Sequence, residues 1–291
     1  MFGETIVLAY SMKPGEKLTY KTEVFSEQSV QEEGGSPQSF SSKMEMTMLQ
    51  EGKKVNPDGS MEVDVTIVSG SIEKEGETAQ IPTVGQVITI VMRPSGEIVR
   101  TSVNFPFSQP SFPEKQLKVS DNWTGDSQMD IPLFDDEGNQ TGTKKADLTY
   151  HYTLGGVEQA RGYEVAVINV SCPETSFDLT EDTTQTITAT GTTYFSHKAG
   201  RLVKSQVATV TEIKAPTATV GTKIKVIVEL TDASGGGTGG GLEAGFMGGA
   251  LGGGGLAGGG FGGGIVGGGS GNFGGGGPGT LGGGDDEFLI T

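Results

Sequence analysis

The sequence predicts an all-β fold, namely an antiparallel, internally duplicated sheet that is curved or folded into a sandwich, followed by a glycine-rich C-terminal segment. Three observations indicate this fold. Residues 5–230 alternate apolar and polar side chains as strands do, with almost no helical periodicity. Three phrases of the first half recur in the same order in the second half. The composition then changes abruptly after residue 233, where glycine dominates.

The clearest strand is TKIKVIVEL, residues 222–230. Its apolar residues alternate with Lys223, Lys225 and Glu229, which predicts a half-buried strand with these three charges on the solvent side. Turn sequences such as NPDG, PSGE and HKAG separate the strand-like runs, because Pro presets φ and Gly accepts a positive φ. The alternation therefore places Ile224, Val226, Val228 and Leu230 on the core side.

The internal repeat covers residues 17–103 and 147–207. LTYKTEV (residues 18–24) recurs as LTYHYTL, MEVDVTIVS (61–69) as YEVAVINVS, and SGEIVRTSV (95–103) as AGRLVKSQV. A structural duplication predicts that equivalent residues superpose and that equivalent strand positions face the core. The expected matches are Tyr20 with Tyr150, Val63 with Val165 and Gly96 with Gly200, and the expected core positions are Val63, Val65, Val165 and Val167.

Composition divides the chain into an all-β globular unit (residues 1–233), a glycine-rich segment (234–284) and an acidic and apolar C-terminal peptide (285–291). In the glycine-rich segment, large apolar residues recur at every fifth position, which gives no single apolar stripe in a strand or an extended helix. We expect contacts between chains to order this segment. The candidate assembly residues are Phe246, Leu251, Leu256, Phe261, Val266, Phe273, Phe288, Leu289 and Ile290.

Energetics favour packing between chains over folding of an isolated tail. Ordering each residue costs roughly 1–2 kcal/mol, whereas burying a large apolar side chain returns only about 1.5–3 kcal/mol, and most residues of the segment are glycine. Two other interpretations stay open, namely a flexible linker and a membrane segment. We expect no membrane insertion, because glycine lacks apolar surface and no basic residue flanks the segment.

Two phrases, FPEKQLKVSDNW (residues 112–123) and YFSHKAGRLVKSQ (194–206), carry a family resemblance. The chain resembles uncharacterised bacterial envelope β-proteins and, more distantly, the LolA/LppX-type lipoprotein carriers. This resemblance implies a curved antiparallel sheet with an apolar hollow. It transfers no functional residue to this sequence.

No catalytic, cofactor-binding or metal-binding constellation stands out. His151 and His197 are the only histidines, and Cys172 is the only cysteine, so we expect a non-enzymatic protein that needs no cofactor. Asp135, Glu137 and Asn139 alternate like calcium ligands, but the glycine of a calcium loop is missing, which favours a solvated turn. The formal charge of −16 argues against nucleic acid as a partner.

These observations predict a structural subunit of an extracellular or cell-envelope assembly, such as a filament or surface layer, that self-associates through its tail. Glu4 stands where a secretory leader would carry a basic residue, so we expect a leaderless chain or one that begins after processing. Two alternatives remain. The protein could carry an apolar ligand or lipid in a curved sheet, or act as an adaptor that docks a partner through its tethered C-terminal peptide.

Overall fold

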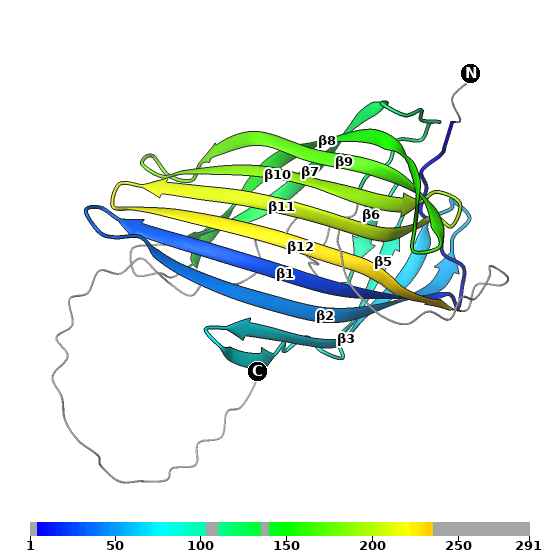
Figure 1. Cartoon of the computed structure of the whole chain (residues 1–291), viewed down its shortest axis with the longest axis horizontal. Helices are drawn as coiled ribbons and strands as arrows, with labels where there is room; N and C mark the ends of the chain where they lie inside the picture. The colour runs from blue at the N-terminus through cyan, green and yellow to red at the C-terminus, as the bar shows by residue number, and fades with distance from the viewer. Residues whose placement is uncertain (1–4, 103–109, 135–139, 235–291) are drawn as a thin grey trace, which may run out of the picture.

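A computed structural model describes residues 5–102, 110–134 and 140–234, and these form one open antiparallel sheet of 12 strands (Figure 1). The all-β antiparallel fold expected from the sequence is confirmed, and no helix occurs among the described residues. In chain order the strands are β1 (Lys17–Glu32), β2 (Gln38–Val55), β3 (Met61–Lys74), β4 (Glu77–Gln80), β5 (Val87–Met92), β6 (Ile98–Thr101), β7 (Asn122–Phe134), β8 (Gln140–Ala160), β9 (Tyr163–Asp178), β10 (Thr184–Ser196), β11 (Arg201–Ala215) and β12 (Ala218–Ser234).

The order across the sheet is β6-β5-β3-β2-β1-β12-β11-β10-β9-β8-β7, and β4 extends β3 beside this path. Most pairings join consecutive strands. The exceptions are β3 with β5, which skips β4, and β1 with β12, which brings the first and last strands together at the centre. The sheet curls so that one face is concave (Figure 1). Its two edges, β6 and β7, therefore belong to the middle of the sequence.

Strand alternation sets the concave face. On β1, Leu18, Tyr20, Thr22 and Val24 are buried and alternate with more exposed residues, as the two-residue period of a strand requires. On β12, Val226, Val228 and Leu230 are buried and Lys223 and Lys225 are exposed, as expected.

Glu229 departs from the expected pattern, because its side chain is only 1% exposed. Arg161, in the turn between β8 and β9, forms an ion pair with one carboxylate oxygen, although without hydrogen-bond geometry. Lys204 on β11 donates a hydrogen bond of 2.8 Å to the other oxygen. Glu229 lies on the face opposite Val228 and Leu230, as alternation predicts, but the expectation that it is exposed to solvent was wrong, because Arg161 of the β8–β9 turn covers it.

Val63 and Val65 face the core as predicted. Val165 is buried and Val167 is half-buried, but both lie on the face of β9 opposite the core residues. A bulge in the β8–β9 pairing lies between Leu154 and Gly156, opposite Ile168 and Val167. Ala166 and Ile168 take the core positions instead. The extra residue of this bulge, Gly155, belongs to β8, so β9 itself alternates without interruption. The prediction for Val165 and Val167 was wrong because YEVAVINVS carries apolar residues on both faces, so alternation alone does not show which face of β9 meets the core.

The repeated phrases do not all occupy equivalent strands. The second and third pairs do, because the hairpins β3–β5–β6 and β9–β10–β11 follow the same order. The first pair does not, since β2 lies between β1 and β3 whereas β8 pairs directly with β9. The expected match of Tyr20 with Tyr150 is therefore inconsistent with this strand order. Duplication of the remaining hairpins stays a prediction.

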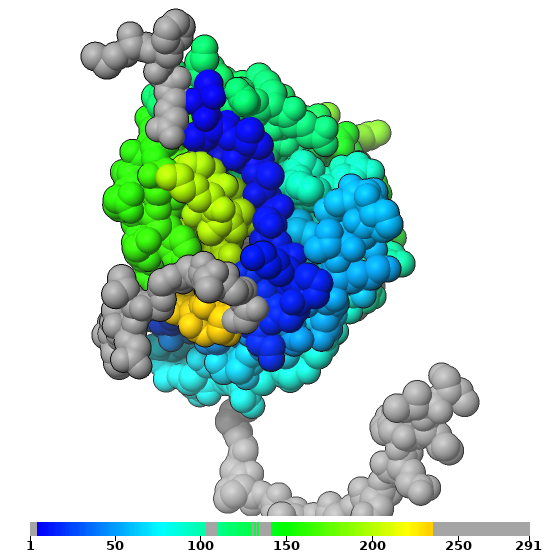
Figure 2. All heavy atoms as spheres, turned by 90° about the vertical axis from the view of Figure 1, so that its right-hand side faces the viewer, coloured from blue at the N-terminus to red at the C-terminus, as the bar shows by residue number. Residues whose placement is uncertain are grey.

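Residues 5–13, which we call the N-terminal strap, cross one end of the curled sheet (Figure 2). Tyr10 donates its amide hydrogen to Pro94 in the β5–β6 turn (N–O 2.7 Å), and Ser11 donates to Gly200 in the β10–β11 turn (2.8 Å). Ile6 exchanges two hydrogen bonds with Leu117. The strap thus ties the two equivalent hairpin turns together and closes that end of the concave face.

Candidate functional site

An aromatic group lies under the strap at the closed end. Tyr10 of the strap, Phe112 of the segment before β7 and Phe195 of β10 contact one another, with ring centroids 4.6 to 5.1 Å apart. The two pairs that include Phe195 meet edge to face, whereas Tyr10 and Phe112 stack. Three segments far apart in the sequence therefore meet here, and such ring contacts stabilise the closure.

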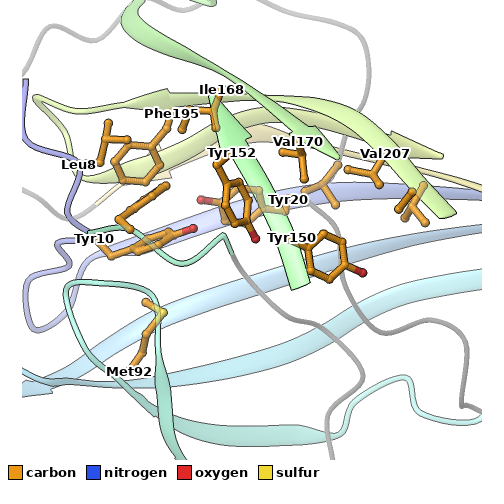
Figure 3. Packing of buried hydrophobic residues seen from close by; sticks show 14 of the residues in the cluster. Leu8, Tyr10, Tyr20, Met92, Tyr150, Tyr152, Ile168, Val170, Phe195 and Val207 are labelled. Atoms are coloured by element: carbon orange, nitrogen blue, oxygen red, sulfur yellow. The ribbon is translucent and has the colours of Figure 1, made fainter. Parts of the chain in front are cut away.

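Four tyrosines, which we call the tyrosine cluster, line the concave face beside this aromatic group (Figure 3). They come from the strap, β1 and β8. The only tryptophan of the chain, Trp123 on β7, stacks on Tyr152 at 5.4 Å and donates its indole hydrogen to the Ser111 carbonyl at 2.8 Å. The members of the tyrosine cluster are Tyr10, Tyr20, Tyr150 and Tyr152.

The cluster phenols stay protonated over the ordinary pH range. Burial raises the pKa of Tyr150 to about 12 and raises the pKa of Tyr10, Tyr20 and Tyr152 further above the usual value. Tyr20 and Tyr152 also raise the pKa of Tyr10 electrostatically, and Figure 3 shows these three side chains grouped on the concave side. The cluster therefore presents neutral O–H groups that can donate hydrogen bonds.

Two buried hydroxyl groups have no hydrogen-bond partner among the described residues. They are Tyr10 Oη and Thr22 Oγ1, which we call the orphan hydroxyls. Neighbouring hydroxyls are satisfied, since Tyr20 donates to the Leu202 carbonyl at 3.2 Å. An unsatisfied buried polar group costs about 1–3 kcal/mol, so two of them in one region require a physical reason.

Thr22 lies in a row of residues that pair directly across the sheet. Val228 lies opposite Thr22, Ser205 opposite Val228, and Thr193 opposite Ser205. Thr193 and Ser205 hydrogen-bond each other through their side chains at 2.7 Å, while Thr22 has no such neighbour. The concave face thus carries a polar row in which only one hydroxyl lacks a partner.

Two charged residues that act on the tyrosine cluster, Arg201 and Glu16, neutralise each other. Arg201 and Glu16 form an ion pair of 2.6 Å, with side chains 13% and 6% exposed, and both affect the pKa of Tyr20. Glu16 also accepts a hydrogen bond of 2.8 Å from the Lys13 amide. The pair anchors the end of the strap to β11, and it leaves the cluster without an uncompensated charge.

Beyond the cluster the concave face is apolar for one row and then mixed, since Thr209 and Thr211 of β11 and Thr222 of β12 follow on the same face. Val24, Val226, Val207 and Val170 form the next row across the sheet, and Ala189, Cys172 and Ile187 follow along β9 and β10. Eight residues along β11 separate the Ser205 row from the Ile213 row, about 26 Å at 3.3 Å per residue. At that far row Gln185, 3% exposed, has a side-chain carbonyl with no partner among the described residues.

The residues singled out from the sequence are not part of this site, apart from Cys172. The predicted assembly residues, from Phe246 to Ile290, lie outside the described residues, as do Asp135, Glu137 and Asn139. His151 is exposed on β8, whereas His197 sits in the β10–β11 turn, 3.3 Å from Glu164. Cys172 is buried, and burial raises the pKa of its thiol. Within the described ranges, no three His, Cys, Asp or Glu side chains could hold a metal ion.

Sequence reasoning missed the tyrosine cluster. Tyr150 and Tyr152 share one face of β8, and Tyr20 occupies a core position of β1, so strand alternation alone could have marked three members. Tyr10 could not be marked in this way, because the strap makes only isolated hydrogen bonds rather than a ladder.

The comparisons with known proteins identify no family. No protein family and no curated protein matches the chain. Among solved structures, it is similar to DynF from the dynemicin biosynthesis pathway of Micromonospora chersina, with 6% identity and a TM-score of 0.19, over 77% of this chain and 85% of that chain. A TM-score this low does not establish a common fold. No helix long and apolar enough to cross a membrane occurs within the part of the chain that the structure describes.

Proposed function

We propose that the protein is a non-enzymatic carrier that binds an apolar ligand on the concave face of its sheet. The observation that carries this proposal is the pair of orphan hydroxyls on a face whose buried residues are predominantly apolar. Binding sites for small molecules combine predominantly apolar walls with a few convergent polar groups, and this face has both. A ligand atom at the orphan hydroxyls would offset the cost of burying them.

A binding experiment with matched variants tests the proposal. Ala189 on β10 lies on the concave side, whereas Ala208 on β11 is exposed on the outer side. Enlarging each to Leu adds the same volume to opposite faces. A brominated alkane that reaches the concave face should quench Trp123 fluorescence in the unmodified protein and in Ala208→Leu, and bind Ala189→Leu at least about tenfold more weakly, since added volume in a packed face is costly.

Equal binding by both folded variants would contradict the proposal, as would the absence of quenching in the unmodified protein. Thermal unfolding of each variant checks that a loss of binding does not arise from loss of the fold. Ala208→Leu is the matched control, because it introduces the same side chain into the neighbouring strand.

Assembly through the glycine-rich segment, the first function expected from the sequence, stays a prediction. The residues that would carry it lie outside the described part of the chain, and so does the C-terminal peptide of the adaptor alternative. An extracellular or cell-envelope location likewise stays an expectation.

A further inference from the structure

We propose that the acidic and apolar C-terminal peptide, residues 285–291, docks on the outer face of the sheet of its own molecule. The docking surface lies across β1, β12 and β11, which are neighbours at the centre of the sheet (Figure 1). This inference is independent of the carrier proposal, because it concerns the opposite face. We call the surface the outer patch, and its residues are Phe25, Ala208, Val210, Lys223, Lys225 and Ile227.

The outer patch carries apolar side chains where a strand with one buried face normally presents polar ones. Phe25 and Ala208 lie on either side of Lys225, directly opposite it in the two pairings of β12. In the next row Val210, which is 44% exposed, lies opposite Lys223. Adjacent apolar side chains with polar groups around them are typical of an interaction surface.

The two lysines of the outer patch have no counter-charge. The other lysines of β1, β11 and β12 all form ion pairs, and these are Lys17, Lys21, Lys204 and Lys214. Lys223 and Lys225 are exposed and form no ion pair with any residue that the structure describes, although Glu27 lies opposite Lys223. Glu23, the nearest carboxylate on the other side, is already paired with Lys21 at 3.0 Å. The patch therefore attracts an anionic group.

The C-terminal peptide, which lies outside the described residues, has the complementary composition. In DDEFLIT, residues 285–287 are acidic and residues 288–290 are large and apolar. The carboxylates can pair with the two lysines while the apolar side chains cover the apolar residues between them. The formal charge of the chain is −16, so most of its surface repels such a peptide, and unpaired lysines beside apolar residues provide a specific attraction.

The length of the chain allows docking within one molecule. β12 ends at Ser234, nine residues beyond Lys225, which is about 30 Å at 3.3 Å per residue. Residues 235–284 can span up to about 165 Å when extended, so the peptide can return to the patch. A tether also raises the local concentration of the peptide at its own sheet, which favours docking in the same molecule over docking on a second copy in dilute solution.

Cross-linking of the full-length protein tests the inference. A carbodiimide joins a carboxylate directly to a lysine amine that contacts it, without a spacer. Equal amounts of normal and heavy-isotope protein are mixed in dilute solution, cross-linked and analysed by mass spectrometry. Most cross-links of residues 285–287 should lead to Lys223 or Lys225, and both linked peptides should carry the same isotope.

Two variants test the apolar contact and keep every reactive group. Val210→Ser and Phe288→Ser should each lower the yield of these cross-links at least about threefold, because each removes apolar area from the contact. Val157→Ser on β8 is the matched control, since Val157 is 42% exposed and lies outside the patch, and it should leave the yield unchanged. Thermal unfolding checks that the sheet variants fold, and Phe288→Ser leaves the sheet itself unaltered.

Several results would overturn the inference. Cross-links of residues 285–287 to exposed lysines elsewhere, such as Lys54 and Lys118, in the same yield as to the patch would show that the peptide has no preferred site. Linked peptides of different isotopes would place the peptide on a second copy. The absence of cross-links to Lys223 and Lys225, or equal yields in Val210→Ser and Val157→Ser, would show that the outer patch does not hold the peptide.

Discussion

Tyr10 differs from the other members of the tyrosine cluster because its hydroxyl group is buried without a partner. Tyr20 donates a hydrogen bond to the Leu202 carbonyl. Tyr152 stacks on Trp123, and burial raises its pKa while a backbone hydrogen bond at Ser111 lowers it. Such a residue lowers the stability of the folded protein, so its presence in a core requires a physical reason. The carrier proposal supplies one, since a bound ligand would offset this cost.

The tyrosine cluster predicts a loss of stability at alkaline pH. Burial raises the folded-state pKa of Tyr150 from 10 to about 12, so its proton is released first in the unfolded chain. The stabilisation is fully present below pH 10 and is lost as the pH rises through 12, by about 3 kcal/mol for two pKa units. The other three cluster tyrosines act in the same direction.

Absorbance titration of tyrosinate checks this prediction. In the folded protein, ionisation of the cluster tyrosines should coincide with alkaline unfolding, whereas in urea all six tyrosines should ionise together near the ordinary value of about 10. Ionisation of all six near that value in the folded protein would show that the cluster is open to water.

Glu229 predicts a second residue-scale effect. Its carboxylate is 1% exposed and contacts Arg161 and Lys204, so Glu229→Gln should lower the free energy of unfolding by about 2–3 kcal/mol. The matched control is Glu212→Gln, since the Glu212 side chain is 41% exposed and forms its ion pair with the exposed Lys214. For this variant we expect a loss of less than about 1 kcal/mol. Urea unfolding measures both, and equal effects would contradict a structural role of the buried network.

At the scale of elements, the strands followed from the sequence and the strap did not. Alternation in β3 and β12 predicted most buried positions, because the two-residue period is local. The burial of Glu229, the face of β9 that meets the core and the path of the strap depend on contacts between distant segments. In the tyrosine cluster, Tyr20, Tyr150 and Tyr152 lie on strands and could be inferred from alternation, whereas Tyr10 lies on the strap and could not.

The strap requires glycine where it passes the β5–β6 turn, and this predicts a position-specific effect. A Cβ at Gly96 would meet the Pro110 carbonyl oxygen at 2.5 Å and the Tyr10 ring at 2.7 Å, and φ is +90°. Gly76 has a similar φ of +84° but open space around it. Gly76→Ala should therefore lower the free energy of unfolding by about 1–2 kcal/mol, and Gly96→Ala by more than about 3 kcal/mol.

Chemical denaturation measures the difference between these two variants, and amide exchange locates it. In Gly96→Ala the amide hydrogen of Tyr10, which is bonded to Pro94, should exchange faster than in Gly76→Ala. Equal destabilisation by both variants would show that the strap does not press against the turn.

At the scale of the whole molecule, the pairing of β1 with β12 unites two halves that run through the sheet as one meander. The third pair of repeated phrases places Gly96 and Gly200 in equivalent turns, and both glycines have a positive φ and contact the strap, through Tyr10 and Ser11 respectively. The strap thus closes one end of the concave face by contacting the equivalent turn of each half. The sequence predicted the repeat of these turns, but not the segment that joins them.

The glycine-rich segment gives a prediction that separates assembly from binding. Deletion of residues 235–291 leaves every described strand intact, so the shortened protein should fold and bind the alkane probe as the full-length protein does. If the tail drives self-association, analytical ultracentrifugation should show loss of oligomers on deletion. Loss of alkane binding in a folded deletion variant would show that the tail contributes to the binding face.

The measurement that tests the central claim most directly is methyl NMR of the protein during addition of the brominated alkane. Val207 on β11 and Ala189 on β10 face the concave side. Ala208 and Val210, also on β11, face the outer side, and Val210 is 44% exposed. The account predicts saturable shift changes and ligand contacts for Val207, Ala189 and Thr22, with little change for Val210 and Ala208. Shift changes confined to the outer face, or none on either face, would contradict it.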